Sequence, residues 1–492
     1  MNSRGKPAER LNILFIASEA DPLVKAGGLG DVAGALPVAI QHLNQGTTNL
    51  TIDTRLAIPF YNHIRLKNLP TEPLTSFFVD TLTGPVKATV FSIKIEDVVT
   101  YLVAGEPISR SDTTYGTDFK ADAEKFIFFS LACLKIPSAL QWDCDILHAN
   151  DWHTAVAVHQ LSSIQRKDRY LKSTRSVLTV HNLPFMGTGA EEALKLYQVK
   201  PAGNQALPQW AKTLPLPMGL AAADSIIAVS PTYSREILTP EFGCDLQDFL
   251  ITRKEHLSGI LNGIDVNSWN PEKDPEIASN FEKNTIAVRK DNKAALLKEF
   301  HFNHAQNIPL LVLISRMDRQ KGVDILIEGL RAAKDLPWRV ILLGTGDRNL
   351  EQACKDLEEE MPDKVRAAIL FDTALSRRMY AGADILLMPS RYEPCGLSQM
   401  YAMRYGCLPL ARATGGLVDT VFDADTSPAP TGFLFPDATA HSFHGALLRA
   451  LSHYRNQEEW RQMQLNGMTQ DFSWTLSANN YLDLYTQLHN PY

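Results

Sequence analysis

Short apolar runs rich in Val, Ile and Leu alternate with helix-like patterns along most of this 492-residue chain. The first half contains the runs NILFIA, TRLAIP, DILHAN, RSVLTV, DSIIAVS and LSGILNG, and the second half contains LLVLISR, WRVILLGTG, ADILLMPS, CLPLARA and TGFLFP. A strand that is buried on both faces reads as a continuous apolar run, and helices between such strands cover a parallel sheet. The pattern therefore predicts an α/β fold with parallel sheets.

Residues 75–105 depart from this rhythm. They read as strands joined by a turn at Thr83-Gly84-Pro85, so we expect an antiparallel insertion here. The rhythm stops again at Asn262, where a polar stretch with two prolines runs to the next strand pattern, IPLLVLISR. We therefore predict two Rossmann-like domains, residues 1–262 and 263–472, that face a deep cleft and bind ligands outside the carboxyl ends of their strands.

The last segment, residues 473–492, carries a helical stripe of apolar and aromatic side chains. Such a helix must dock on something, and we expect it to pack back on the first domain. The stripe consists of Leu476, Tyr481, Leu484, Tyr485 and Leu488.

Composition narrows the class of protein. The formal net charge of −7 argues against a general nucleic-acid binder, which would show a basic excess. The six cysteines form no C-x-x-C pair, and reduced thiols are the expected state. No apolar run is long enough for a membrane span or an export signal, so we expect a cytoplasmic protein without a membrane partner.

The stretch VKAGGLGDVAGALP follows the first strand pattern and resembles an anion site. Gly27, Gly28 and Gly30 let backbone N–H groups approach a ligand, and the following helix would point its positive end at the same place. Lys25 precedes them and Asp31 follows. The spacing fits neither G-x-G-x-x-G nor the P-loop, so dinucleotide and P-loop functions are not indicated.

Two further basic residues follow a strand in the second half, within SRMDRQKGVDILIEGL. Arg316 ends the strand and Lys321 is expected to open a helix, so both would point into the cleft. An exposed surface charge would explain Lys321 alone, but the paired placement favours a diphosphate clamp.

Polar clusters follow two neighbouring strands of the first half. Asp151 and His153 come after DILHAN, while His181 and Asn182 come after RSVLTV. Groups that grip sugar hydroxyls would have this arrangement, and so would a hydrolase site.

A carboxylate, Glu393, lies in the loop after ADILLMPS, just before a helix start that offers N–H groups to an anion. This placement favours a sugar-binding carboxylate over a simple helix-start residue. The two D-x-D triplets, residues 143–145 and 423–425, are interpreted as solvated charge, and no metal is expected. Lys25, Arg316 and Lys321 can neutralise a diphosphate instead.

At this point the sequence resembles the bacterial glycogen synthases and plant starch synthases. The motifs KAGGLGDVAGALP, HANDWHTA, TVHNLPFMG, AVSPTYSREI, GILNGIDVNSWNP, SRMDRQKG, PSRYEPCGLSQMYAMRYGCLPL and TGGLVDTV follow one another in the family's order. The match runs from about Asn12 to Tyr485, which is nearly the whole chain.

The resemblance implies a GT-B fold and a retaining glucosyltransferase that needs no cofactor. Glucose would pass from ADP-glucose to the 4-hydroxyl at the non-reducing end of an α-1,4-glucan such as glycogen or starch, releasing ADP. The resemblance implies five catalytic residues, which are Glu393, Arg316, Lys321, His181 and Lys25. The residues matched to the donor are Lys25, Gly27, Gly28, Asp31, Asn182, Arg316, Lys321, Phe371, Gly396, Leu397 and Ser398. Those matched to the acceptor are Asp151, His153 and Tyr115.

Two positions, Phe371 and Tyr115, differ from the family pattern, and a third, Tyr401, is usual for the family but differs from related enzymes. Phe371 stands where Tyr commonly stacks on the adenine, which keeps the aromatic face and loses a hydroxyl. Tyr115 lies in a segment that follows the family's acceptor segment only in part. Tyr401 occupies the second position of the E-x7-E pattern of related enzymes, which leaves Glu393 as the main carboxylate.

Other functions stay open. UDP-glucose is an alternative donor, and a catalytically silent glucan-binding or priming relative is an alternative of another class. The specific motifs argue against a sucrose synthase or a sugar-nucleotide epimerase.

Overall fold

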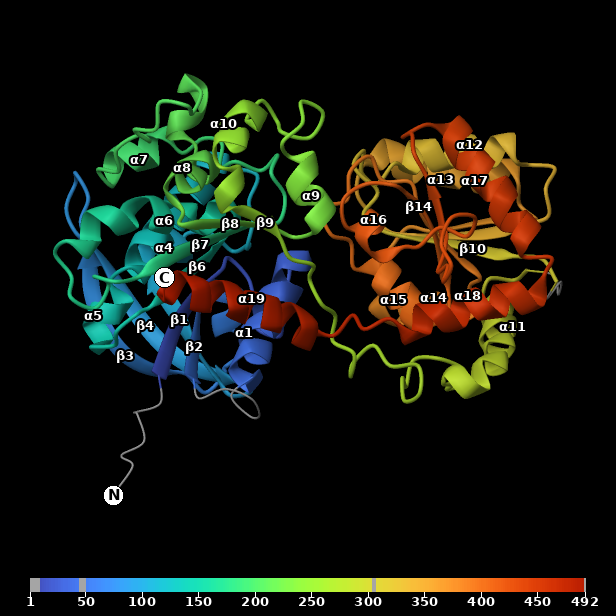
Figure 1. The fold of residues 1–492 in the computed structure, drawn as a ribbon, viewed down its shortest axis with the longest axis horizontal. Coiled ribbons are helices and arrows are strands. Elements are labelled where there is room, and N and C mark those ends of the chain that lie inside the picture. The colour runs from blue at the N-terminus through green and yellow to red at the C-terminus, as the bar shows by residue number, and fades with distance from the viewer. Residues whose placement is uncertain (1–8, 44–49, 303–306, 491–492) are drawn as a thin grey trace, which may run out of the picture. The chain divides into compact units, whose positions relative to one another are not determined.

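A computed structural model describes residues 9–43, 50–302 and 307–490. The chain separates into two compact units (Figure 1). The first unit comprises Met1–Gly263 together with Trp474–Tyr492, and the second comprises Ile264–Ser473.

The first unit is built on one sheet, which has nine strands within the described residues. These are β1 (Glu9–Ile16), β2 (Leu50–Pro59), β3 (Glu72–Val79), β4 (Val86–Ile95), β5 (Val98–Gly105), β6 (Ile146–Asn150), β7 (Arg175–Val180), β8 (Ser225–Ala228) and β9 (Leu257–Gly259). Their order across the sheet is β3-β4-β5-β2-β1-β6-β7-β8-β9. The pairs from β5 through to β9 are parallel.

Helices surround this sheet in the first unit. They are α1 (Gly28–His42), α2 (Asn62–Arg65), α3 (Glu106–Ser109), α4 (Phe119–Cys133), α5 (Ile136–Leu140), α6 (Asp151–Gln165), α7 (Glu191–Leu196), α8 (Pro215–Ala222), α9 (Pro231–Glu236), α10 (Gln247–Thr252) and α19 (Trp474–His489), with the 3-10 turns η2 (Gln209–Thr213) and η3 (Lys254–His256).

The expected antiparallel insertion is present but smaller than its sequence span. β3 and β4 form a hairpin across the turn at residues 83–85, and β4 is also antiparallel to β5. β5 itself runs parallel to β2, with Arg55 opposite Val99. β5 is therefore a member of the parallel sheet, and only β3 and β4 extend its edge as an addition.

The second unit holds a sheet of six strands within the described residues, all parallel. They are β10 (Leu310–Ile314), β11 (Arg339–Leu343), β12 (Val365–Ala368), β13 (Ile385–Met388), β14 (Leu408–Arg412) and β15 (Phe433–Phe435). Their order is β12-β11-β10-β13-β14-β15. The helical elements are η4 (Lys283–Val288), α11 (Arg289–Glu299), α12 (Val323–Ala332), α13 (Arg348–Glu360), α14 (Thr373–Gly382), α15 (Ser398–Arg404), α16 (Gly416–Thr420), α17 (Ala440–His453) and α18 (Gln457–Thr469).

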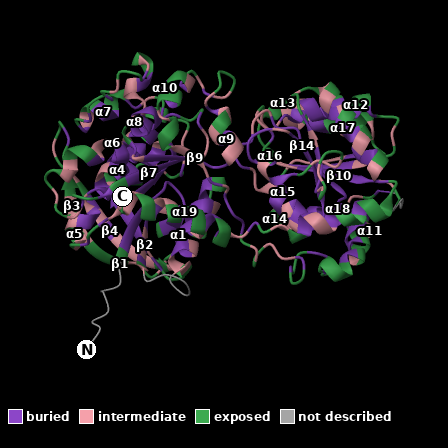
Figure 2. Cartoon of the chain, viewed as in Figure 1, coloured by how far each residue is buried: buried purple, intermediate pink, exposed green. Residues whose placement is uncertain are grey.

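Burial on both faces explains the continuous apolar runs. Successive side chains of a strand point to opposite faces of the sheet. In β10, Leu311 and Leu313 join the core on one face, while Leu310 and Val312 join the core on the other. Figure 2 shows the buried residues concentrated along the strands of each unit. The predicted fold class, two Rossmann-like units with parallel sheets, is confirmed.

The C-terminal helix α19 packs against α1 and belongs to the first unit. Its buried Tyr485 hydroxyl lies 2.5 Å from Nδ1 of His148 on β6, and Nε2 of the same imidazole lies 2.7 Å from the hydroxyl of Thr179. Burial holds the pKa of His148 well below its usual value, so this imidazole is neutral. At the start of α19, the Ser477 hydroxyl donates to the carbonyl of Leu261 at 2.6 Å.

In the part of the chain that the structure describes, no helix combines the length and the apolar character that crossing a bilayer requires.

Candidate functional site

The order of the second sheet reverses between β10 and β13, which are neighbours although β11 and β12 lie between them in the chain. Ligands of open α/β sheets bind at such a reversal, outside the carboxyl ends of the strands. The loop after β10 carries Arg316 and Lys321, and the loop after β13 carries Glu393. The fold therefore places these residues at the reversal.

Lys321 and Glu393 form a close ion pair at this point. The Lys321 ammonium lies 2.8 and 2.7 Å from the two carboxylate oxygens, and the Ser390 hydroxyl donates to the same carboxylate at 2.9 Å. The Glu393 side chain is only 7% exposed, so its charge depends on these partners. Glu393 is a buried acceptor held in one orientation.

A glycine keeps the two loops together. Gly322 adopts φ 67°, and a Cβ atom there would lie 2.0 Å from the carbonyl oxygen of Pro389. The helix α12 begins at Val323, after this glycine. The prediction that Lys321 opens the helix is therefore wrong: Lys321 lies in the preceding turn, where its backbone N–H donates to Asp318 Oδ1 at 3.0 Å.

Arg316 is placed differently from Lys321. Its side chain is 64% exposed and forms an ion pair with Asp318 at 3.1 Å, with Gln320 Oε1 at 3.4 Å. Its side-chain contacts in the described structure are with these two residues and not with Glu393. The guanidinium is thus presented to solvent from the end of β10, where an anionic ligand can reach it.

The loop after β14 supports the Glu393 loop from its other side. Gly416 donates its backbone N–H to the Glu393 carbonyl at 3.1 Å. Gly415 adopts φ 46°, and a Cβ atom there would lie 2.0 Å from that carbonyl oxygen. Sequence reasoning assigned no role to these two glycines, although the pair follows a strand and begins a short helix, α16, which is a usable signal.

Two helix starts complete this half of the site. Gly396 adopts φ 72° just before α15, whose first residue is Ser398. α15 packs against α14. Phe371 precedes the N-cap of α14, Asp372, and is 88% exposed. An aromatic side chain this exposed offers a free face for stacking.

In the first unit the glycine loop (residues 25–30) contacts a buried carboxylate, Glu19, that the sequence analysis did not identify. Glu19 Oε2 accepts the backbone N–H groups of Ala26 and of Gly27, the second at 3.1 Å. Glu19 is 1% exposed, and burial raises the pKa of its carboxyl above the usual value. A charged residue directly after an apolar strand could have drawn attention to it. These two N–H groups are thus satisfied from within the protein.

Lys25 and Asp31 face each other beside this loop, 2.5 Å apart. Burial raises the pKa of the Asp31 carboxyl, an effect that Lys25 opposes. Gly27 precedes α1 and Gly28 begins it, as the anion-site prediction requires of a helix start.

Tyr115 lies against the same carboxylate. Its hydroxyl donates to Glu19 Oε1 at 3.0 Å and lies 2.8 Å from the Ser18 hydroxyl. Its ring centroid is 5.1 Å from that of His153 on α6. The structure therefore brings Tyr115 together with His153, although 37 positions of other sequence separate them.

Asp151 holds the backbone after β7. Its carboxylate accepts the N–H groups of His181 at 2.7 Å and of Asn182 at 3.4 Å. Asp151 itself adopts φ 55°, and burial raises its pKa to about 7. His181 Nε2 lies 2.9 Å from Asn150 Oδ1, and burial lowers the pKa of this imidazole to about 3. The loop at His181 is thus fixed by both its backbone and its ring.

Two buried polar atoms in this region lack a hydrogen-bond partner within the described structure, Nδ1 of His153 and Oδ1 of Asn182. Buried polar groups are nearly always paired, so an orphaned atom needs a reason. A ligand that brings hydroxyl groups would supply the missing partners.

The triplets interpreted as solvated charge are in fact paired. Asp423 and Asp425 both bind Arg449, and Asp145 accepts the backbone N–H of Asn12 at 2.8 Å. Among the residues that the structure describes, no three His, Cys, Asp or Glu side chains gather as metal ligands would.

Comparisons with known proteins identify the same family over nearly the whole chain. Residues 12–252 match the family model of the starch synthase catalytic domain, and residues 297–466 match that of glycosyl transferases group 1. A glycogen synthase of Geotalea daltonii is 37% identical, with 96% of this chain and 98% of the relative covered. One of Anaeromyxobacter dehalogenans is 38% identical, with 97% and 100% covered.

Solved structures give the same result. The catalytic domain of starch synthase IV from Arabidopsis thaliana, bound to ADP and acarbose, superposes with a TM-score of 0.87 at 30% identity, covering 98% of this chain and all of that one. A sucrose-phosphate synthase of Thermosynechococcus elongatus, at 20% identity and a TM-score of 0.61, shares the fold alone. The chain therefore belongs to the family of bacterial glycogen synthases and plant starch synthases, which are glucosyltransferases of the GT-B fold.

Proposed function

We propose that this enzyme transfers glucose from ADP-glucose to the non-reducing-end 4-hydroxyl of an α-1,4-glucan, with retention of configuration and release of ADP. The observation that carries the proposal is the buried Glu393 carboxylate, fixed by Lys321 at the reversal of the second sheet. ADP in the Arabidopsis starch synthase IV structure supports the choice of donor.

The donor is assigned to groups that suit its chemistry. Arg316 and Lys321 bind the diphosphate, whose charge they neutralise. The Gly396–Ser398 helix start offers N–H groups to a phosphate, and Phe371 stacks on the adenine. Glu393 accepts hydrogen bonds from hydroxyls of the transferred glucose. In the first unit Lys25 and the Gly27-Gly28 turn, with Asp31, are assigned to the diphosphate as well.

The glucan side is assigned to the first unit. His153 has a buried atom that awaits a hydroxyl partner from the glucan, and the Tyr115 ring lies beside it. Asn182, which is matched to the donor, has a buried oxygen available to a hydroxyl of the transferred glucose. Asp151 contributes by holding the backbone of His181 and Asn182 in place. His181 then borders the glucose that is transferred.

The reaction breaks the bond between C1 of glucose and the diphosphate oxygen, and the electron pair leaves with ADP. The acceptor O4 forms its bond to C1 on the same face, and its proton passes to an oxygen of the leaving phosphate. Arg316 and Lys321 stabilise the charge that grows on the diphosphate, which is a preorganised electrostatic effect. No separate base is needed for this sequence.

The test is a donor comparison with purified protein. Glycogen is incubated with ADP-glucose or UDP-glucose, and release of ADP or UDP is measured beside the digestion of the lengthened chains by an α-1,4-specific glucanase. We expect ADP release and digestible chains.

The other results separate the alternatives. Faster release of UDP assigns the donor to UDP-glucose, and a product that resists the α-1,4-specific enzyme contradicts retention. If the protein binds glycogen but releases neither ADP nor UDP, it is a silent or priming relative.

A further inference from the structure

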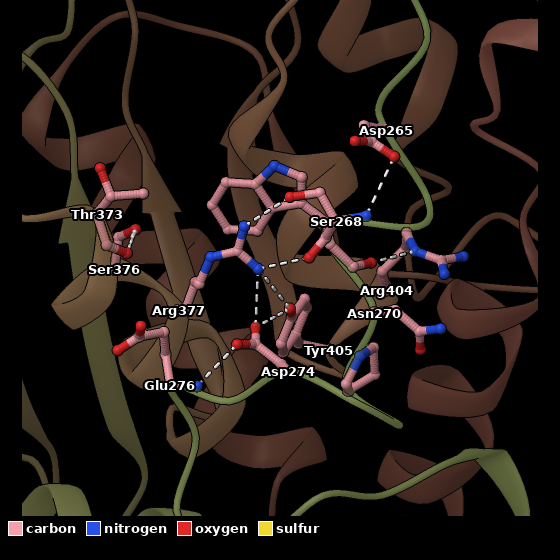
Figure 3. A network of polar contacts seen from close by, with 12 residues as sticks. Asp265, Ser268, Asn270, Asp274, Glu276, Thr373, Ser376, Arg377, Arg404 and Tyr405 are labelled. Atoms are coloured by element: carbon pink, nitrogen blue, oxygen red, sulfur yellow. Dashed lines mark hydrogen bonds and ion pairs between the residues drawn. The ribbon is translucent and has the colours of Figure 1, made fainter. Parts of the chain in front are cut away.

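A buried ion-pair network fixes an irregular segment of the second unit, the connecting segment (residues 265–282). Asp274 has a fully buried carboxylate that accepts from Arg377 Nη1 at 2.9 Å and from the hydroxyl of Tyr405 (Figure 3). The same guanidinium donates to the carbonyl of Ser268 at 2.6 Å and to its hydroxyl at 2.9 Å. The network therefore ties the connecting segment to α14, which carries Arg377.

An aromatic stack extends the network to α15. The Trp269 ring lies 4.0 Å from the ring of Tyr401 in a stacked arrangement, and the Arg377 guanidinium lies 4.1 Å from the centre of the Trp269 ring. Arg404 donates to the Trp269 carbonyl at 2.9 Å. Tyr401 and Arg404 both belong to α15. One segment thus contacts the middle of α14 and the end of α15.

The starts of these two helices carry groups of the proposed donor site. Phe371 stands two residues before α14, and Ser398 is the first residue of α15. The two helices also pack directly against each other. Because a short helix moves as a rigid body, a contact that fixes one of its turns also fixes its start.

Stability alone does not account for this arrangement. Taking a carboxylate and a guanidinium out of water is costly, and apolar side chains of equal volume often stabilise a core at least as well. What the ion pair adds is direction, because a forked guanidinium fits its acceptors in one geometry.

We propose that Asp274, Arg377 and Trp269 are positioning residues for the donor, which set the spacing between the base-binding start of α14 and the phosphate-binding start of α15. The inference rests on the proposed donor site. None of the three residues is assigned a contact with the nucleotide. ADP binding therefore depends on a network that lies behind its site, and the Trp269 ring changes its surroundings when ADP binds.

The first experiment replaces the ion pair without leaving a lone buried charge. The full-length double variant Asp274→Asn with Arg377→Gln is compared with the parent for ADP binding by calorimetry and for both KM values. Misplacement by about 1 Å can cost as much as ~10²-fold. We expect the Kd for ADP and the donor KM to rise roughly tenfold, with the glycogen KM unchanged.

The matched control is another buried ion pair of the same unit. Lys293 and Asp384 lie 2.6 Å apart with similar burial, and Asp384 precedes β13, at the opposite end of this strand from Glu393. The double variant Lys293→Gln with Asp384→Asn should lower Tm yet leave the Kd for ADP as it is. The positioning role is overturned if the Kd for ADP rises equally in both double variants. It is also overturned if the Kd rises in neither of them.

A spectroscopic test does not depend on the ion pair. ADP should change the tryptophan fluorescence of the parent, and Trp269→Phe should remove that change while calorimetry still shows ADP binding. A fluorescence change that persists in Trp269→Phe overturns the link between Trp269 and the donor.

Phe371→Ala separates this inference from the proposed function. If Phe371→Ala leaves the Kd for ADP unaltered, the donor site itself is misplaced. If it weakens ADP binding while Asp274→Asn with Arg377→Gln does not, the donor site stands and the positioning role falls.

Discussion

Substitutions of single side chains in the candidate site should differ in whether they affect folding or only catalysis. Lys321 holds the buried carboxylate of Glu393, so its removal leaves an unpaired charge and affects folding as well as chemistry. Arg316 is mostly exposed, with Asp318 and Gln320 as its neighbours. Its loss should therefore report on chemistry alone.

Arg316→Ala should lower kcat by about 10²–10³, the usual cost of losing one group that stabilises a developing charge. The Tm should stay within the range of a surface substitution, because the side chain is exposed. Arg319→Ala, an exposed arginine in the same loop, is the control and should leave kcat unaltered. Steady-state kinetics and calorimetry check both. A kcat for Arg316→Ala within about threefold of the parent, under ~1 kcal/mol of barrier, removes this residue from the mechanism.

Asp151 should give stability an unusual pH dependence. Burial raises its pKa from 3.8 to about 7, so the folded protein binds the proton more tightly than the unfolded chain does. Its contribution to stability is therefore complete below about pH 4 and is lost as pH rises to about 7. Asp151→Asn keeps an oxygen for the N–H groups of His181 and Asn182 and removes the titration. The Tm of this variant relative to the parent should rise between pH 5 and 7.5, and a constant difference would contradict the assignment.

At the scale of elements, the local sequence pattern predicted the strands that are buried on both faces. It did not predict features that depend on residues far away in the sequence. Apolar runs mark β1, β6, β10 and β13 because both faces of each strand are buried. β12 reads VRAA, too short and too polar to stand out, and it forms because β11 pairs with it. Sequence reasoning also placed Lys321 and Glu393 at strand ends. Their mutual contact is non-local, and so is the closure of the glycine loop on Glu19, so neither could be read from spacing.

The packing of α19 on the first unit should depend on the buried hydroxyl of Tyr485. Tyr485→Phe removes the partner of His148 Nδ1 and leaves a buried polar atom unsatisfied, at a cost of about 1–3 kcal/mol. We expect a lower midpoint in denaturant unfolding. Leu476→Ala, on the same helix but 54% exposed, is the control and should cost within about 0.5 kcal/mol. Equal midpoints for Tyr485→Phe and the parent would show that the hydroxyl contributes nothing.

Both units of the molecule place their candidate residues at the point where the strand order of the sheet reverses. The parallel strands of each sheet reverse their order once, between β1 and β6 in the first unit and between β10 and β13 in the second. The candidate residues follow these strands or their neighbours, which is why strand-end reasoning on the sequence found most of them. The side chains at both reversals include cations suited to a diphosphate.

Turnover should withstand chelation. Lys25, Arg316 and Lys321 supply the positive charge that a diphosphate needs, so EDTA should leave the rate of ADP release within about twofold, well under ~1 kcal/mol of barrier. Dialysis against EDTA followed by the donor assay measures this. Loss of activity that Mg²⁺ or Mn²⁺ restores would assign part of that role to a metal ion.

The return of α19 to the first unit has a consequence during synthesis. A ribosome makes the chain in order, at about 5–20 residues per second, so residues 264–473 occupy it for roughly 10–40 s after the rest of the first unit has emerged. For that interval the nascent first unit lacks its last helix. The side of α1 that α19 covers is then exposed, and His148 lacks its Tyr485 partner. During this interval a chaperone can bind the uncovered surface of α1.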